Sequence, residues 1–392
     1  MKLNDLPQSF VDDLVAIRRD IHANPELGFQ ELRTSALVAE RLKAFGVDEV
    51  HTGIAKTGMV AVIKGKRKGG SMGLRADMDA LPMQEKNIFF HASKRAKTMH
   101  ACGHDGHTTM LLGAAKYLAE TRNFAGTVHL IFQPAEEGGG GGELMCLEGL
   151  FDRFDCDRVF AVHNRPDLEL GKWGTRVGPF MASTDSFAIT INGRGGHAAR
   201  PHLVCDPMVV AANFILAAQT IVSRNLSPLD TAVVGVSAVE GGHLPANNVV
   251  PDSVTLTGTV RTYDTKTQAL IEARLGEMVH GICAAHRATG VYEFKRGYPP
   301  VINTRDGVEF AHSVASEVWG ETNCDSNYNP SMGGEDFAYM LQKRPGCFSV
   351  IGQGIPGQPI VPLHNTQYDF CDAIIPNGVR YFSRLVEKGL PL

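Results

Sequence analysis

Apolar residues recur along the chain at two spacings, one typical of amphipathic helices and one typical of buried strands. The stretch 10–23 shows the helical spacing, because its apolar positions share one face and its charged positions share the other. Asn24-Pro25 then ends the predicted helix. The predicted inward face holds Val11, Leu14, Val15 and Ile17, and the predicted outward face holds Asp12, Asp13, Arg18 and Arg19.

Short apolar runs alternate with further helical stretches up to about residue 182. This alternation is typical of β-α-β units, which build a largely parallel sheet flanked by helices. The predicted helices are 35–44 and 106–120, and the predicted strands are 59–63, 72–75, 127–132 and 159–162.

The middle of the chain has a different order of elements, strand-helix-strand-strand-helix-strand, which matches a ferredoxin-like sandwich. The α/β order then resumes with a helix and a strand. We therefore predict one discontinuous α/β domain, 1–182 and 297–392, into which a βαββαβ domain, 183–296, is inserted. The predicted strands of the insertion are 186–191, 231–239, 253–262 and 291–294, its helices are 207–222 and 265–286, and the resumed elements are 307–319 and 347–351.

The balance of charges disfavours one large class of partner. The chain has 38 Lys and Arg against 42 Asp and Glu, a net charge of −4, which argues against a broad basic face for nucleic acid. Residues 1–10 lack the apolar core of a secretion signal, and the longest apolar stretch, 208–222, is too short to span a bilayer. The eight Cys are scattered without a Cys-x-x-Cys pair, so we expect no disulfide framework, no membrane partner and a cytoplasmic location.

A dense group of potential metal ligands stands where the predicted helix 106–120 begins. The sequence there is HACGHDGH, at 100–107. A thiolate and an imidazole two residues apart, as in Cys102 and His104, suit zinc or another first-row divalent ion. The alternative is a polar helix entry in which Asp105 caps the helix and Cys102 is simply buried.

Two adjacent carboxylates, Glu136 and Glu137, follow the predicted strand 127–132 almost directly. Ligands gather at the carboxyl ends of strands in open α/β sheets, and adjacent glutamates could divide the work between metal binding and general base catalysis. His163 ends the next predicted strand, and His364 follows a loop rich in Gly and Pro. Taken singly, each of these residues also fits a solvated loop or an ordinary satisfied histidine.

Seven motifs, in order along nearly the whole chain, resemble the M20 metallopeptidase family, in its amidohydrolase branch of hippurate hydrolases and plant auxin-conjugate hydrolases. The family fold, a catalytic domain interrupted by a lid and dimerisation domain, agrees with the predicted division of the chain. The motifs are RDIHANPELGF at 19–29, RADMDALP at 75–82, CGHD at 102–105, QPAEEG at 133–138, GGHA at 195–198, GGEDF at 333–337 and LHN at 363–365.

The resemblance implies a site for two divalent metal ions, which would be zinc, manganese, cobalt or nickel. Cys102 is the candidate bridging ligand, Glu136 would be the general base that takes a proton from water, and Asp77 would orient a ligand. The wider family often has a histidine ligand two residues before that acid; Arg75 stands there in this chain, so His104 must supply the imidazole. The implied ligands are Cys102, His104, Glu137, His163 and His364.

The resemblance also implies functional roles for three residues of the inserted domain. His197 would reach the active site of a second subunit, in a homodimer or higher homo-oligomer, and bind the developing oxyanion. Asn248 and Arg261 would contact the substrate, and Arg261 could bind its carboxylate through two hydrogen bonds. Judged without the resemblance, His197 is a loop histidine and Arg261 is a partner for a surface acid.

The implied activity is metal-dependent hydrolysis of the amide bond of N-acyl amino acids, either hippurate-like or N-acetylated. One alternative is a dipeptidase or a small-molecule deacetylase of the same family. Another is a non-catalytic binding protein that kept the fold, against which the intact Glu136 and the five potential ligands argue. The sequence leaves the acyl group, the amino acid and the native metal open.

Overall fold

The computed structural model describes residues 2–392, which divide into two compact units. Unit 1 comprises the residues up to Phe180 together with Ile302–Pro330 and Asp336–Leu392, and unit 2 comprises Met181–Val301 and Ser331–Glu335. The sequence placed the boundaries at 182/183 and 296/297 and assigned 331–335 to the first domain. The catalytic role of one part and the lid role of the other stay predictions.

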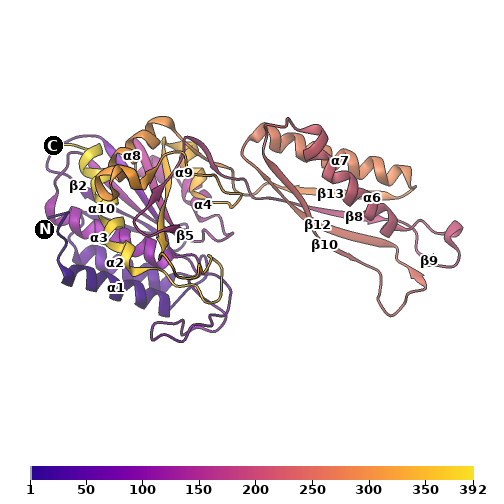
Figure 1. Cartoon of the computed structure of the whole chain (residues 1–392), viewed down its shortest axis with the longest axis horizontal. Coiled ribbons are helices and arrows are strands. Elements are labelled where there is room, and N and C mark those ends of the chain that lie inside the picture. The colour runs from indigo at the N-terminus through magenta and orange to yellow at the C-terminus, as the bar shows by residue number, and fades with distance from the viewer. Residues whose placement is uncertain (1) are drawn as a thin grey trace. The chain divides into compact units, whose positions relative to one another are not determined.

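Unit 1 is built on an eight-stranded sheet in the order β1-β2-β4-β3-β5-β16-β6-β15. Figure 1 labels two of its strands, β2 and β5. Neighbours among β4, β3, β5 and β16 run parallel, whereas β1-β2, β2-β4 and β16-β6 are antiparallel, so the sheet is mixed. The strands are β1 (Glu49–Ile54), β2 (Gly58–Lys64), β3 (Ser71–Asp77), β4 (Thr127–Gln133), β5 (Arg158–Glu169), β6 (Trp173–Gly174), β15 (Cys324–Asp325) and β16 (Gly346–Gly354).

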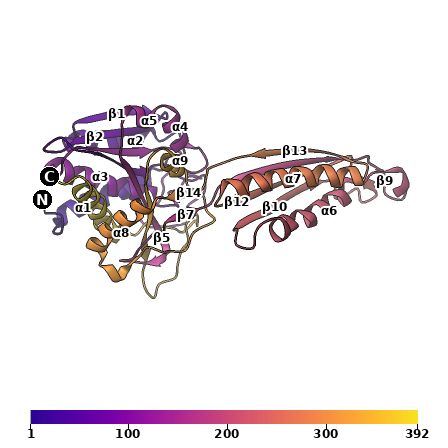
Figure 2. The same ribbon diagram turned by 90° about the horizontal axis from the view of Figure 1, so that it is seen from above.

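Helices flank this sheet and close its core (Figure 2). The helix α3 packs against β3, α1 and α10, and its side chains from His104 to Ala115 are all buried. The large aromatic residues Phe132 and Phe160 are fully buried in the same core. The predicted α/β class with helix-flanked sheet is confirmed. The helices are α1 (Gln8–Ala23), α2 (Leu32–Ala44), α3 (His104–Thr121), α4 (Gly141–Leu147), α5 (Leu150–Arg153), α8 (Arg305–Trp319), α9 (Phe337–Lys343) and α10 (Ile375–Gly389), with 3-10 turns η3 (Glu321–Asn323) and η4 (Asp372–Ile374).

One side chain of α1 contradicts the predicted orientation. Arg18 was predicted to face outward, yet only 1% of it is exposed. Carboxylates of Asp105, Asp369 and Asp372 lie around its guanidinium and offset the cost of burying it. These partners are far from Arg18 in sequence, so the helical pattern could not show them.

Unit 2 is a four-stranded antiparallel sheet in the order β10-β12-β8-β13, with α6 and α7 on one face (Figures 1 and 2). This is the strand order of a ferredoxin-like sandwich. A separate two-stranded ladder joins β9 and β11. The elements are β8 (Asp185–Asn192), β9 (Gly196–His197), η1 (Pro201–Leu203), α6 (Pro207–Thr220), η2 (Ile221–Asn225), β10 (Ala232–Gly241), β11 (Val249–Val250), β12 (Ser253–Thr262), α7 (Thr265–Ala285) and β13 (Thr289–Lys295); β7 (Gly178–Met181) and β14 (Val301–Asn303) include the boundary residues.

The apolar helix of unit 2 is longer than the sequence predicted. A π-helical turn, η2, continues α6, so the helix Pro207–Asn225 reaches 19 residues. By length and composition it is the one helix among residues 2–392 that could cross a membrane. Val210 and Phe214 nevertheless pack into the core of unit 2, and the core helix of a folded domain passes the same test. The cytoplasmic location stays a prediction.

Candidate active site

Unit 1 brings all five predicted ligands and Glu136 together. Cys102 and His104 lie at the start of α3, Glu136 and Glu137 follow β4, His163 lies within β5, and His364 lies in the loop after β16. Within each of four groups in this unit, the potential ligand atoms lie within 4.8 Å of one another. The groups are Cys102-His104-His163, Cys102-Glu137-His364, His104-Glu136-Glu137 and Asp77-His104-His107.

Left-handed backbone at two positions shapes the segments that carry these side chains. Gly103 has φ 99°, and a Cβ atom there would lie 2.2 Å from Asn164 Oδ1, so only glycine fits at the start of α3. His364 has φ 61°, and its backbone N–H donates to the carbonyl oxygen of Ala101 at 2.8 Å. The His364 loop is therefore attached to the residue before Cys102.

Hydrogen bonds turn two imidazoles toward the group of donors. His104 Nδ1 lies 3.0 Å from the backbone oxygen of Asp79, while its Nε2 is buried without a hydrogen-bond partner. His163 Nδ1 lies 2.8 Å from the backbone oxygen of Asn164, and its Nε2 lies 3.4 Å from Cys102 Sγ. A metal-binding histidine is typically held in this way, by its other ring nitrogen. The donor set therefore fits a divalent ion.

The protonation of these donors would change if a cation bound among them. Burial raises the pKa of the Cys102 thiol well above its usual range, and Glu137 adds to the effect. Burial lowers the pKa of His163 well below its usual range, with His107 adding, so its imidazole is neutral and has a free electron pair. His364 Nε2 lies 3.2 Å from Glu137 Oε1, and this nearby carboxylate raises the pKa of His364. A bound cation would favour the thiolate and compete for the carboxylate.

Asp77 lies beside these donors, and both of its carboxylate oxygens contact neighbouring side chains. Its Oδ1 lies 2.6 Å from His107 Nδ1, and its Oδ2 accepts from Arg75 at 2.8 Å. Burial opposes its ionisation, but the charges of His104 and Arg75 outweigh burial and lower its pKa well below the usual range. Asp77 Oδ2 is 3.7 Å from His104 Nε2, so the hydrogen bond that orients His104 comes from Asp79 instead.

The sequence did not single out three residues that support this arrangement. Asp79 Oδ1 lies 3.1 Å from His104 Nδ1, and its Oδ2 accepts from the backbone N–H of Glu137 at 2.9 Å. His107 lies between Asp77 and Asn164, and Asn164 in turn donates to Tyr368 Oη at 2.7 Å. His107 could have been found, since it lies three residues after His104 on the same helix face. Asn164 carried no comparable pattern.

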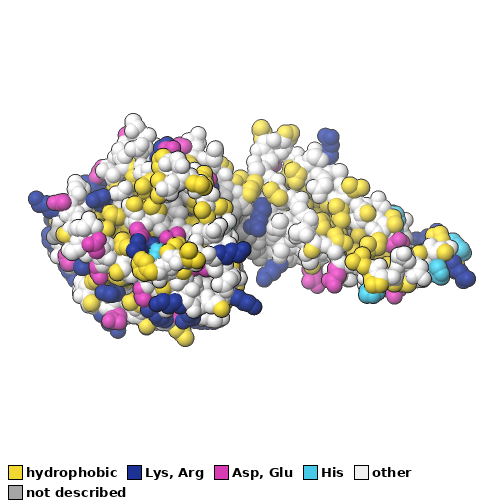
Figure 3. Space-filling view, turned by 60° about the horizontal axis from the view of Figure 1, so that its bottom comes forward, with side chains coloured by type: hydrophobic (Ala, Val, Ile, Leu, Met, Phe, Trp, Pro, Cys, Tyr) yellow, Lys and Arg dark blue, Asp and Glu magenta, His cyan; other side chains and the backbone are white. Residues whose placement is uncertain are grey.

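The three predicted residues of unit 2 do not form one cluster. His197 on β9 pairs with Val249, and Asn248 accepts from Ala198 at 2.9 Å, so these two exposed residues are neighbours. Histidine and basic side chains gather at this end of unit 2 (Figure 3). Ser253 begins β12 at the end of unit 2 that carries His197, and Arg261 lies near the other end of that strand. At 3.3 Å per residue, the distance from Ser253 to Arg261 along the strand is roughly 26 Å. One small molecule cannot touch Arg261 and the His197 end of the same unit.

Known proteins are similar to this chain over nearly its whole length. The family model described as peptidase family M20/M25/M40 matches residues 73–388. The hippurate hydrolase of Campylobacter jejuni is 43% identical over 95% of this chain and 96% of its own, and the IAA-amino acid hydrolase ILR1-like 4 of Arabidopsis thaliana is 39% identical over 97% and 86%. The crystal structure of a dinuclear metal-binding peptidase from Bacillus subtilis superposes with a TM-score of 0.84, at 32% identity, over 98% and 99% of the chains.

Proposed function

The chain belongs to peptidase family M20/M25/M40, and from this premise we propose that it is a metal-dependent amidohydrolase that cleaves the amide bond of N-acyl amino acids. The observation that carries the proposal is the convergence of a thiol, imidazoles and a carboxylate beside a second carboxylate, Glu136. Hippurate and the IAA-amino acid conjugates named for the two relatives are both N-acyl amino acids.

Five side chains are our proposed ligands for two divalent ions. Both the donor chemistry and the buried, unpartnered His104 Nε2 support this, because a buried polar atom without a partner is costly. Thiolate and imidazole donors favour zinc, cobalt or nickel over magnesium or calcium, and the carboxylate of Glu137 keeps manganese among the candidates. Divalent ions held there would polarise the amide carbonyl and lower the pKa of bound water from about 15.7 to about 7. The proposed ligands are Cys102, His104, Glu137, His163 and His364; Cys102 belongs to two of the donor groups and would be the ligand that both ions share.

Glu136 is the proposed general base. It is 8% exposed, and its Oε2 lies 4.0 Å from His104 Nε2, at the edge of the donor group. Glu136 would take a proton from the attacking water and pass it to the leaving amine, a transfer typically worth about 10²–10⁴-fold in rate. Asp77 would hold His107 and balance the charge of Arg75 beside the ligands.

We propose that the three functional residues of unit 2 serve two active sites in a homodimer. Arg261 would bind the substrate carboxylate, whereas Asn248 and His197 would contact a substrate in the active site of a second copy. The separation of Arg261 from His197 along unit 2 supports this division. An edge strand, β10, and the outer face of α6 offer an apolar surface for the homodimer. Its exposed residues include Met208, Val209, Leu216, Val233 and Val239.

A substrate panel tests the proposed activity. Protein reloaded with zinc, manganese, cobalt or nickel is incubated with N-benzoylglycine, N-acetyl amino acids and dipeptides, and the products are quantified. We expect release of free amino acid from the N-acyl substrates and loss of turnover after chelation. Preferential cleavage of dipeptides would assign the chain to the dipeptidases instead. Absence of hydrolysis with every metal and every substrate would reject the proposal.

A further inference from the structure

Arg18 on α1 is a buried cation that contacts carboxylates from two other parts of unit 1. Its Nη1 lies 2.7 Å from Asp369 Oδ1 and 3.6 Å from Asp105 Oδ2. Its Nε and Nη2 lie 2.7 and 2.6 Å from Asp372 Oδ1. One planar guanidinium therefore joins three carboxylates that approach it from different segments.

These segments also carry proposed metal ligands. Asp105 follows His104 in the first turn of α3, and Asp369 and Asp372 follow His364 in the C-terminal segment. The two segments meet again at the hydrogen bond from the His364 N–H to the Ala101 carbonyl. A shift of one segment against the other would therefore alter the distance between Cys102 and His364, which share a donor group with Glu137.

Charge explains why this spacing depends on a cation at position 18. Asp105 is fully buried, and His22 Nδ1 lies 2.9 Å from its Oδ2 on the side of α1. Arg18 lies within 4 Å of both Asp105 and Asp369, whereas His22 contacts Asp105 and His91 contacts Asp369. Without Arg18, the repulsion between these partly buried carboxylates would lose the cation that the two share. A lysine would restore the charge but not the planar set of donors that reaches all three carboxylates.

We propose that Arg18 is a positioning residue that holds the start of α3 and the His364 segment at the spacing required for metal binding. This inference rests on the proposed metal site. It assigns Arg18 no contact with substrate, and its effect passes through Asp105 and Asp369.

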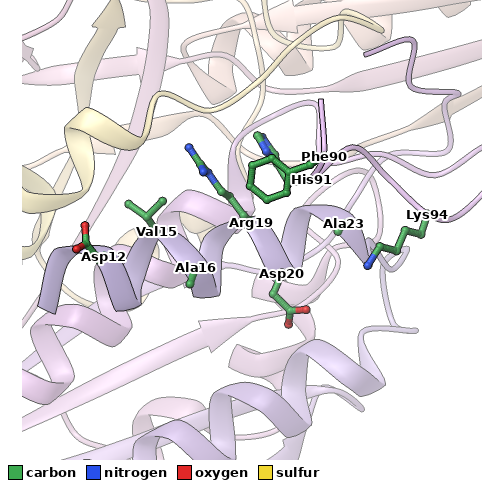
Figure 4. A pocket seen from close by; sticks show the side chains of 9 residues that line it. All are labelled: Asp12, Val15, Ala16, Arg19, Asp20, Ala23, Phe90, His91 and Lys94. Atoms are coloured by element: carbon green, nitrogen blue, oxygen red, sulfur yellow. The ribbon is translucent and has the colours of Figure 1, made fainter. Parts of the chain in front are cut away.

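The neighbouring residue provides a matched control. Arg19 lies on the same helix, and its Nη2 contacts Asp372 Oδ2 at 2.8 Å. Among the residues that the structure describes, Asp372 is its one carboxylate partner. Arg19 lies in a surface groove of about 470 Å³, with its guanidinium 5.2 Å from the centre of the Phe90 ring (Figure 4). Arg19→Met removes a guanidinium that contacts Asp372 but neither Asp105 nor Asp369.

The test compares wild type, Arg18→Met, Arg18→Lys and Arg19→Met. Dissociation constants for zinc are measured by competition with a chromophoric chelator, and the absorption spectrum of the cobalt-loaded protein reports ligand geometry. Circular dichroism and urea unfolding of the metal-free proteins measure folding separately. We expect Arg18→Met to weaken zinc binding about 10–100-fold, the usual range for loss of a residue that supports metal ligands, and to change the cobalt spectrum. Arg18→Lys should lie between wild type and Arg18→Met, and Arg19→Met should match wild type.

Wild-type zinc affinity and an unchanged cobalt spectrum in folded Arg18→Met would overturn the inference, even if that variant unfolds at lower urea concentration. If Arg18→Met does not fold, Arg18→Lys decides by the same two measurements. An equal loss of affinity in Arg19→Met would also overturn it, because the effect would then not depend on Asp105 and Asp369. Wild-type protein that binds no divalent ion would instead reject the proposed function.

Discussion

His22 should make the stability of unit 1 fall as the pH rises above neutrality. The side chain is fully buried, with Nδ1 2.9 Å from Asp105 Oδ2 and Nε2 3.3 Å from Glu85 Oε1. Burial opposes its protonation, but hydrogen bonds to Asp105 and Glu85 outweigh burial and raise its pKa from 6.5 to about 9. Each ring nitrogen thus donates to a carboxylate, and the buried ring carries a positive charge.

The sign and size follow from this pKa. A histidine whose pKa is higher in the folded than in the unfolded chain stabilises the fold below the unfolded value, near 6.5. That stabilisation is lost as the pH rises through the folded value, about 9. At about 1.4 kcal/mol per pH unit, the difference corresponds to about 3 kcal/mol. The lowered pKa of Asp105 reflects the same interaction and is not added to it.

The assay is urea unfolding of metal-free wild type and His22→Gln between pH 6 and pH 10, followed by tryptophan fluorescence. Both tryptophans, Trp173 and Trp319, lie in unit 1, so the signal reports that unit. We expect wild type to exceed His22→Gln by about 3 kcal/mol at pH 6, with the difference shrinking toward zero near pH 10. His51→Gln, at a surface histidine beside Glu49, is the control. A His22→Gln difference that stays constant or grows with pH would refute the charged pairing.

Three further results are expected. Gly106→Ala should cost about 1–3 kcal/mol in urea unfolding, because the new Cβ would lie 2.2 Å from the Phe370 ring, whereas Gly281→Ala on α7 meets no atom within 4 Å and should be neutral or stabilising. Dialysis against a chelator should abolish hydrolysis and lower the melting temperature of unit 1, and added zinc or manganese should restore both; full activity of metal-depleted protein would contradict the site. Equal amounts of inactive Glu136→Gln and His197→Ala subunits, once exchanged, should regain about a quarter of wild-type activity if His197 acts across subunits, and none if it acts within its own chain.

Local patterns in the sequence predicted most of the elements. The strand 253–262 of unit 2 forms with the predicted bounds, and α6 and α7 begin at the predicted residues. These segments have strong alternation or long apolar faces. β1 was not predicted, because it is an antiparallel edge strand in which only the last residue, Ile54, is buried. β5 was predicted to end before His163 but continues to Glu169, since β16 pairs with it beyond that point.

The sequence predicted the donor residues of the candidate site but not the residues that hold those donors in place. Residue type and family resemblance together predicted five ligands and Glu136, and unit 1 brings these side chains together. The charged positions on α1 gave no indication that Arg18 would be buried, because its partners come from α3 and from the end of the chain. Asp79 and Asn164 act through backbone and side-chain hydrogen bonds that form only when β3, α3 and β5 are assembled. Contacts of this kind depend on tertiary structure and leave no local pattern.

The most direct test of the central claim is one preparation of Glu136→Gln, loaded with the metal that supports wild-type turnover. Metal per chain and hydrolysis of the best N-acyl amino acid are measured on the same sample. Removing the carboxylate should lower turnover by about 10²–10⁴-fold. We expect that loss together with a wild-type metal content, since Glu136 is the proposed base and not one of the proposed ligands. Turnover close to wild type, with the metal retained, would contradict the assignment of Glu136.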